Sequence, residues 1–391
     1  MKRRKALSAL LCALALILCA RPLLAEPKTT FTKEELLADY DQLFRDLYEN
    51  DPFLPVLAQR GVNVEALQAQ NRDVLKSRVT DLEGFVFLLR DTFYRMGNLA
   101  HLMLIDASRF DFYRAHPYPP RDPLVEDPQT QATYALLGAG GRGDALFPDA
   151  PEVETRYFPD EQAAYFCFAS FDYPTIARDR DVVADALAAF GDVRHVIFDV
   201  TGNPGGFARA WQENIVSPFG GECVTYVYLR MSPVNEEFFR AVRYAPSPLA
   251  DLPPEVEAPD FAQELGFTHF VPFSLAFPDE DFAGKRVPSQ AKRWVLIDGQ
   301  TYSAADGFAA FCAADGWATL VGSPTVGDGA DPMGFLPIRL ANTGLLVRFS
   351  TATAANADGT ANAVFGTTPD IRCEKGETPL DACLRAIRSF P

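Results

Sequence analysis

The chain has only four histidines among its 391 residues. The sequence also lacks an HExxH motif, a closely spaced histidine pair, an acidic calcium-binding loop and a cysteine pair with the CxxC spacing of a zinc site. These are ligand patterns of common zinc and calcium sites, so the sequence offers no support for metal chemistry, and we expect neither a metal nor a cofactor.

Positive charge is in short supply as well. The chain has 36 lysines and arginines against 52 aspartates and glutamates, which gives a formal net charge of −16. A surface of this sign repels phosphate backbones, and no basic stripe or stacking motif interrupts it. We therefore expect no nucleic-acid partner.

Long apolar runs are missing after the first 25 residues. The chain begins with a basic head over residues 1–5 and an apolar run over residues 6–20, which is typical of a secretory signal peptide. That run is too short for a comfortable membrane span. Leu23-Leu24-Ala25 is an acceptable cleavage site, so we expect a mature protein that begins near Glu26 and has no membrane span. It should be exported to the cell envelope or beyond, which means the periplasm if the source is Gram-negative.

The cysteines bear on lipidation and on disulfide formation. Within the predicted signal, leucine precedes both Cys12 and Cys19, which disfavours lipidation. Near the C-terminus, Cys373 and Cys383 could close a small surface loop in an oxidising compartment. They could equally be free thiols that act as small apolar residues.

Residues 26–105 follow the period of amphipathic helices, which predicts an N-terminal helical domain. A first helix should begin after Thr32, which stands in capping-box register with Glu35. Two further helices should begin near Val62 and after Thr80.

The rest of the chain divides into two parts. Residues 106–154 are rich in proline and glycine, which predicts an irregular connection. Over residues 155–391, apolar runs of strand length alternate with helical patterns, which indicates an α/β domain with a sheet covered by helices. Its segment from about 219 to 292 is rich in aromatics and prolines. It is either a cap or lid over the core or an insertion in the core with no functional role.

Ser303 has the most favourable position for a nucleophile. A buried strand is predicted to end at Asp298 and a helix to begin at Ala304, so Ser303 lies at a strand-to-helix junction. Amides at a helix start point toward a group bonded to the serine oxygen, so the amide of Ala304 could stabilise an oxyanion. The alternative is that Ser303 only caps the helix.

A glycine-rich turn follows another predicted strand, in the sequence FDVTGNPGG. Its adjacent Gly205 and Gly206 let the backbone approach a ligand closely and could donate amide hydrogens to an oxyanion. The motif is not the GxGxxG of a dinucleotide site, and it could also be an ordinary turn between a strand and a helix.

Together these motifs resemble the C-terminal processing peptidases, also called tail-specific proteases, a serine-peptidase family that includes the tricorn core. In that family an aspartate-ended strand and an Asn-Pro-Gly-Gly turn precede the nucleophile, as FDVTGNPGG precedes Ser303. A family element Gly-x-x-Pro-Asp-Ile matches residues 366–371, so the likeness covers about residues 155–375. The resemblance implies a ClpP/crotonase-like α/β core with an N-terminal helical domain. Too few residues lie between His101 and the strand near Ala164 for the PDZ domain of many relatives.

The resemblance also indicates the general base. In the Ser-Lys branch the base is a lysine, but Asp328 stands at that position here and cannot replace the amine as a neutral base. A tricorn-like branch uses a histidine just after the N-terminal helices. His101 stands there, on a short run that we predict to be a strand, and imidazole suits a serine hydroxyl near neutral pH. A lone histidine could also be a structural side chain on a half-buried strand.

The residue that orients the histidine is the least defined. The tricorn-like branch has a glutamate shortly before the Gly-x-x-Pro-Asp element, where this chain has Ala363. Asn362 and Asp358 are polar neighbours, and we predict Asn362, because an amide oxygen can orient a histidine. Either residue could instead cap a turn.

Two acidic residues near these motifs, Asp199 and Asp306, could be interpreted as the paired carboxylates of a glycosidase. We predict instead that Asp199 holds its turn by hydrogen bonds, and that Asp306 favours the positive start of its helix.

The sequence therefore predicts hydrolysis of a peptide or protein substrate through an acyl-enzyme on Ser303, with His101 as the base. The predicted oxyanion donors are the amides of Gly205, Gly206 and Ala304. One alternative is an inactive relative that binds peptides in an inherited cleft, because the lysine and an obvious third member are missing. Another is an esterase of the α/β-hydrolase type, which would require a GxSxG motif that is absent around Ser303.

Overall fold

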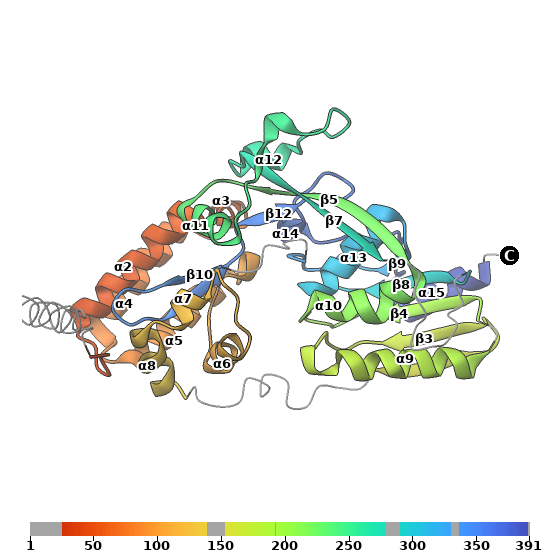
Figure 1. Cartoon of the computed structure of the whole chain (residues 1–391), viewed down its shortest axis with the longest axis horizontal. Coiled ribbons are helices and arrows are strands. Elements are labelled where there is room, and N and C mark those ends of the chain that lie inside the picture. The colour runs from red at the N-terminus through yellow and green to blue at the C-terminus, as the bar shows by residue number, and fades with distance from the viewer. Residues whose placement is uncertain (1–25, 139–152, 192, 278–289, 330–335, 390–391) are drawn as a thin grey trace, which may run out of the picture.

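The chain forms two lobes, one with the N-terminal helices and one with a helix-covered sheet, and a β-ribbon extends across both (Figure 1). The computed structural model describes residues 26–138, 153–191, 193–277, 290–329 and 336–389. The predicted signal peptide and residues 139–152 of the predicted connection lie outside these ranges. None of the helices within them combines the length and the apolar character that a membrane crossing requires.

The first lobe begins with the helices expected from the sequence. They are α2 (Lys33–Asn50), the short α3 (Leu54–Gln59), α4 (Val64–Arg78) and α5 (Leu82–Arg95). The predicted capping box is present, because the Thr32 hydroxyl accepts from the Glu35 amide and the Glu35 carboxylate accepts from the Thr32 amide. These reciprocal bonds satisfy two amides at the start of α2.

Strands from the far end of the chain complete the core of this lobe. The antiparallel sheet β1-β11-β10 consists of β1 (Met103–Leu104), β11 (Leu346–Phe349) and β10 (Leu336–Arg339). Leu43 of α2, Phe85 of α5 and Val347 of β11 are fully buried in the same hydrophobic cluster. The helical domain predicted over residues 26–105 therefore needs a hairpin from the C-terminal part to bury its apolar faces.

Residues 106–138 form helices, and the irregular connection predicted there is wrong. The helices are α6 (Ala107–Ala115), α7 (Asp122–Val125) and α8 (Pro128–Leu136). The prediction failed because prolines stand in the first turns of α7 and α8, where a missing amide hydrogen costs nothing. The carboxylates of Asp106 and Asp127 cap α6 and α8 by accepting backbone amide hydrogens.

The second lobe is built on a sheet with the order β13-β9-β8-β4-β3-β2. Its strands are β2 (Glu154–Phe158), β3 (Ala163–Cys167), β4 (His195–Asp199), β8 (Lys292–Ile297), β9 (Thr319–Gly322) and β13 (Ile371–Arg372). Neighbours are parallel except for β2, which is antiparallel to β3. Val196, Ile197 and Phe198 of β4 are fully buried, as expected for a parallel strand covered on both faces.

Helices cover both faces of this sheet. One face packs against α9 (Ile176–Phe190), α10 (Ala208–Trp211) and α13 (Ala304–Asp315), and the other against α15 (Pro379–Ser389). The predicted fold class, an α/β core with an N-terminal helical part, is confirmed. Cys373 and Cys383 are free thiols in this structure.

The segment predicted as a cap forms the β-ribbon. In it, β5 (Gly221–Leu229) pairs antiparallel with β7 (His269–Phe277), and β12 (Ala352–Ala354) and β6 (Ser247–Pro248) add to its two edges. The helices α11 (Pro233–Val242) and α12 (Asp260–Glu264) lie between its strands in the chain. Tyr228 packs into the core of the helical lobe, whereas Cys223 packs into the α/β core, so the ribbon ties the lobes together (Figure 1).

Candidate active site

Ser303 occupies the turn between β8 and α13 in a strained backbone conformation. Its φ is 54° and its ψ is −126°, which costs free energy for a residue other than glycine. Its side chain makes no capping bond to α13, and its Oγ lies 2.9 Å from Nε2 of His101. The interpretation of Ser303 as a simple helix cap is therefore wrong.

His101 reaches Ser303 from the other lobe, although 202 positions separate them in the chain. It ends a short 3₁₀ turn over Leu99–His101, and β1 begins only at Met103, so the strand predicted at His101 is wrong. The prediction failed because Asn98, Ala100 and His101 have left-handed φ values of 47°, 52° and 56°, which apolar periodicity does not reveal.

The other ring nitrogen of His101 contacts a carboxylate that the sequence pattern did not assign to the site. Nδ1 pairs with Oδ2 of Asp328, and both side chains are buried. Ser350 donates its hydroxyl hydrogen to Oδ1 of Asp328 at 3.0 Å, and Tyr302 donates to Oδ2 at 3.2 Å. Ser303, His101 and Asp328 thus have the connectivity of a Ser-His-Asp triad.

Asn362, the residue predicted to orient the histidine, has other partners. Its Oδ1 accepts from the Gly329 amide at 3.2 Å, and its Nδ2 donates to Asn356 Oδ1 at 3.1 Å and Thr367 Oγ1 at 3.4 Å. The structure corrects the prediction, because the Asp328 carboxylate occupies the Nδ1 side of His101. Asn362 instead accepts from the amide of Gly329, the residue after Asp328, and so holds that loop.

Asp328 carried a signal in the sequence nevertheless. It stands where the Ser-Lys branch has its base, so its side chain must lie near the nucleophile. An aspartate cannot act as that base, but a carboxylate at the same position can pair with an imidazole supplied by another segment. The position was thus identifiable, and only the change of role was missed.

His101 is 1% exposed, and this burial is the largest influence on its pKa. Burial lowers the pKa of His101, the Asp328 carboxylate opposes this in part, and the positive charges of Arg348 and Arg109 lower the pKa further. A lowered pKa keeps the imidazole neutral near pH 7, so it can accept the proton of Ser303.

Tyr302 supports both members of the His101–Asp328 pair. Its ring stacks on the imidazole with centroids 4.7 Å apart, while its hydroxyl bonds Asp328. Burial raises the pKa of Tyr302, so the hydroxyl keeps its proton and remains a donor to the carboxylate.

Two of the three predicted oxyanion donors are available. Within the described part of the chain, the amides of Gly206 and Ala304 donate to no protein acceptor. The Gly205 amide donates to Asn203 Oδ1 at 2.8 Å, so the prediction of Gly205 as a donor is corrected. Gly205 is needed for close approach instead, because a Cβ there would lie 2.7 Å from Cβ of Ser303.

The acidic pair of the glycosidase interpretation is structural. Asp199 accepts from the amide and hydroxyl of Thr201 and from Tyr165, so it holds its turn as predicted. Asp306 is fully buried and accepts from the side chains of Thr325 and Thr367, and burial raises its pKa. Among the described residues, no three metal-ligating side chains are grouped closely enough to hold an ion.

Comparison with known protein families defines the class of this chain as a protease. The sequence model of peptidase family S41 matches residues 162–373, which is more than half of the 391-residue chain. The chain belongs to peptidase family S41, and the resemblance to C-terminal processing peptidases is confirmed.

Solved structures show the same fold. A protein from Parabacteroides merdae ATCC 43184 that is assigned as a peptidase matches with a TM-score of 0.56 at 18% identity, over 92% of this chain and 98% of that chain. Mature CPAF complexed with lactacystin matches with a TM-score of 0.52 at 12% identity, over 91% of this chain and 97% of that chain. No match was found among curated protein sequences.

Proposed function

We propose that this protein is an exported serine peptidase that cleaves peptide bonds through an acyl-enzyme on Ser303. The observation that carries the proposal is the 2.9 Å contact between Ser303 Oγ and His101 Nε2 across two lobes. The strained φ of Ser303 supports it as well, because such strain is typical of functional sites. Membership of peptidase family S41 supports a peptide or protein as the substrate.

In the proposed reaction, Ser303 Oγ attacks the carbonyl carbon while His101 Nε2 takes its proton. The amides of Gly206 and Ala304 receive the oxyanion. The C–N bond breaks, His101 gives its proton to the leaving amine, and the acyl group stays on Ser303 as an ester. Water then attacks the ester with His101 as base, which releases the carboxylic acid and restores the serine.

Both reasons for the alternative, an inactive peptide-binding relative, are weakened. It arose because the lysine base and a third member were both missing from the sequence pattern. Asp328 stands where the lysine would be and contacts His101 Nδ1, so a histidine-based site needs no lysine. We therefore favour the enzyme.

A fluorophosphonate probe tests the proposal. We expect it to label the wild-type protein at Ser303 and to leave Ser303→Ala unlabelled. Ser323→Ala is the matched control, because Ser323 is exposed at the end of β9 and should not affect labelling. If the folded wild type is not labelled, the inactive relative is the better description.

Export belongs to the same proposal and has its own test. We expect protein recovered from the envelope or medium of a bacterial host to begin near Glu26, as measured by mass spectrometry of its N-terminal peptide. Leu11→Arg interrupts the apolar run and should leave the precursor uncleaved in the cytoplasm. Envelope protein that retains Met1 would contradict the cleavage site.

A further inference from the structure

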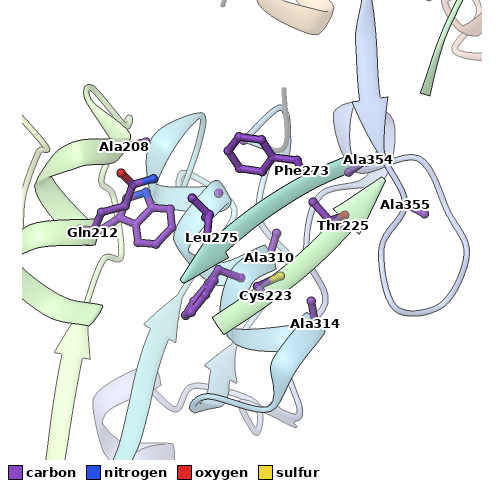
Figure 2. A pocket seen from close by; sticks show the side chains of 14 residues that line it. Ala208, Gln212, Cys223, Thr225, Phe273, Leu275, Ala310, Ala314, Ala354 and Ala355 are labelled. Carbon is purple, nitrogen blue, oxygen red and sulfur yellow. The ribbon is translucent and has the colours of Figure 1, made fainter. Parts of the chain in front are cut away.

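An apolar pocket of about 130 Å³ lies between α10, α13 and the β-ribbon. Figure 2 shows Ala208 and Gln212 on one side, Ala310 and Ala314 of α13 on another, and ribbon side chains that close it. Phe311 and Trp211 also line it. The reaction derived above uses none of these side chains.

The pocket borders the backbone that carries the nucleophile. Gly307 lines it, and its amide donates to the Ser303 carbonyl at 2.8 Å. Gly329 lines it as well, and a Cβ there would lie 2.3 Å from that same carbonyl oxygen. On the opposite side, α10 begins at Ala208, two residues after Gly206. A substrate held by the Gly206 and Ala304 amides therefore lies beside the pocket.

The ribbon turns one face toward this space. Cross-strand pairing sets Cys223 opposite Leu275 and Thr225 opposite Phe273, and all four side chains line the pocket. Val224, between Cys223 and Thr225, is on the other face and 63% exposed, as the two-residue period of a strand requires.

The lining restricts what can bind. None of the described lining residues carries a charge, and Gln212 and Thr225 are the polar side chains among them. A charged group would lose its hydration here without gaining a counter-ion. The volume is close to that of an engineered apolar cavity of about 150 Å³ that binds benzene, so a leucine or methionine side chain is a suitable size.

We propose that this pocket binds an aliphatic side chain, such as leucine or methionine, on the substrate residue that supplies the scissile carbonyl. This inference rests on the proposed function. The acyl side is assigned because α10 and α13 adjoin the oxyanion amides, whereas His101, which protonates the leaving amine, comes from the other lobe. Selection at this position would be independent of the leaving group.

Tripeptide coumarylamides that differ only in their last residue test the inference, because their leaving amine is constant. We expect kcat/KM for leucine and methionine to exceed that for alanine by about 10- to 200-fold, with aspartate and lysine lower still. Fluorophosphonate labelling of Ser303 is measured on the same preparations.

Two adjacent ribbon positions provide matched variants. Thr225→Arg places a cation in the pocket and should move the preference to aspartate, whereas Val224→Arg on the outer face should keep the preference for leucine. Ala310→Phe fills the pocket from α13 and should move the preference to alanine, which gives a second readout if Thr225→Arg fails to fold. Labelling of Ser303 should persist in every folded variant.

The outcomes separate the two proposals. Labelled wild-type enzyme that cleaves leucine and aspartate substrates equally well overturns the pocket assignment and leaves the serine peptidase standing. A shift in preference with Val224→Arg as large as that with Thr225→Arg also overturns it. Wild-type protein that is not labelled overturns the proposed function and this inference together.

Discussion

Ser303, His101 and Asp328 share a backbone property that is rare for residues other than glycine. Their φ values are 54°, 56° and 66°, and Asn98 and Ala100 beside His101 are left-handed too. Each such residue costs of the order of 1–3 kcal/mol, which the surrounding structure must offset. The Ser303 amide donates to the Gly327 carbonyl, and the Ala100 carbonyl accepts from Ser350, so backbone bonds hold the strained turns in place.

Removing the charge of Asp328 should disable the site without unfolding it. In Asp328→Asn the imidazolium formed during reaction loses its partner, so we expect kcat to fall by about 10⁴-fold while the melting temperature stays near that of the wild type. Steady-state kinetics and thermal denaturation measure both effects. Asp358→Asn, at an exposed loop position, is the control and should change kcat little. Retention of a tenth of wild-type kcat in Asp328→Asn would show that another residue orients His101.

The pKa of His101 predicts the acid side of the pH profile. Only neutral imidazole can accept the proton of Ser303, so activity falls as pH drops through the pKa of His101. Because burial lowers this pKa, the midpoint of the acid limb should lie below the ordinary value of about 6.5. Plots of kcat/KM from pH 4 to 8 measure it. A midpoint at or above pH 7 would contradict a buried base with a lowered pKa.

At the level of elements, the glycine turn after β4 and the start of α13 form one packed unit. The Tyr302 amide donates to the Asn203 carbonyl, and Asn203 Nδ2 donates to the Phe168 carbonyl at 2.8 Å. Gly205 lies so close to Ser303 that no side chain fits between them. The position of the nucleophile therefore depends on this turn as well as on its own helix.

Alanine substitutions at two glycines of this turn distinguish the effect of backbone strain from that of steric contact. Gly205→Ala would place a methyl group within 2.8 Å of Ser303 Cβ, the Tyr302 carbonyl and the Ala304 amide, so we expect fluorophosphonate labelling to fall at least about 100-fold. Gly202→Ala also meets a positive φ but has no atom within 4 Å of the new methyl. It should cost about 1 kcal/mol of stability and keep the labelling rate. Equal labelling of the two variants would contradict the contact argument.

Most elements could be predicted from the sequence, because apolar periodicity and caps are local signals. The strand before Ser303, the helix after it and the capping box at Thr32 follow directly from such signals. The turn at His101 could not be predicted, because its left-handed residues are not glycines. The partner of His101 was missed because Asp328 reaches the imidazole only through contacts between lobes.

At the level of the whole molecule, one buried carboxylate connects the helical lobe to the C-terminal hairpin. Asp39 of α2 has no exposed surface and accepts from the backbone amides of Asn342 and Thr343, and from both of their side chains. The hairpin strand β11 in turn pairs with β1, which begins two residues after His101. We therefore expect Asp39 to support the active site from a distance.

Asp39→Ala should weaken this connection. Because it leaves several buried donors without an acceptor, we expect a loss of about 2–4 kcal/mol in the free energy of unfolding, together with slower labelling of Ser303. Urea denaturation and the labelling rate measure the two effects. Asp41→Ala is the control, because its ion pair with Arg72 is half exposed and should contribute less than about 1 kcal/mol. Similar losses of unfolding free energy in both variants would contradict the inference that Asp39 connects the helical lobe to the hairpin.

Residues from the first and last quarters of the chain share one hydrophobic core. This has a consequence for folding during synthesis. A ribosome releases the helices of the first lobe long before it adds residues 338–349, among which Ile338, Val347 and Phe349 help to fill the core between those helices. An unfinished polypeptide lacks that filling and the strand that pairs beside His101. We expect the nascent chain to stay latent until it is almost complete, which spares the cell that synthesises it from premature proteolysis.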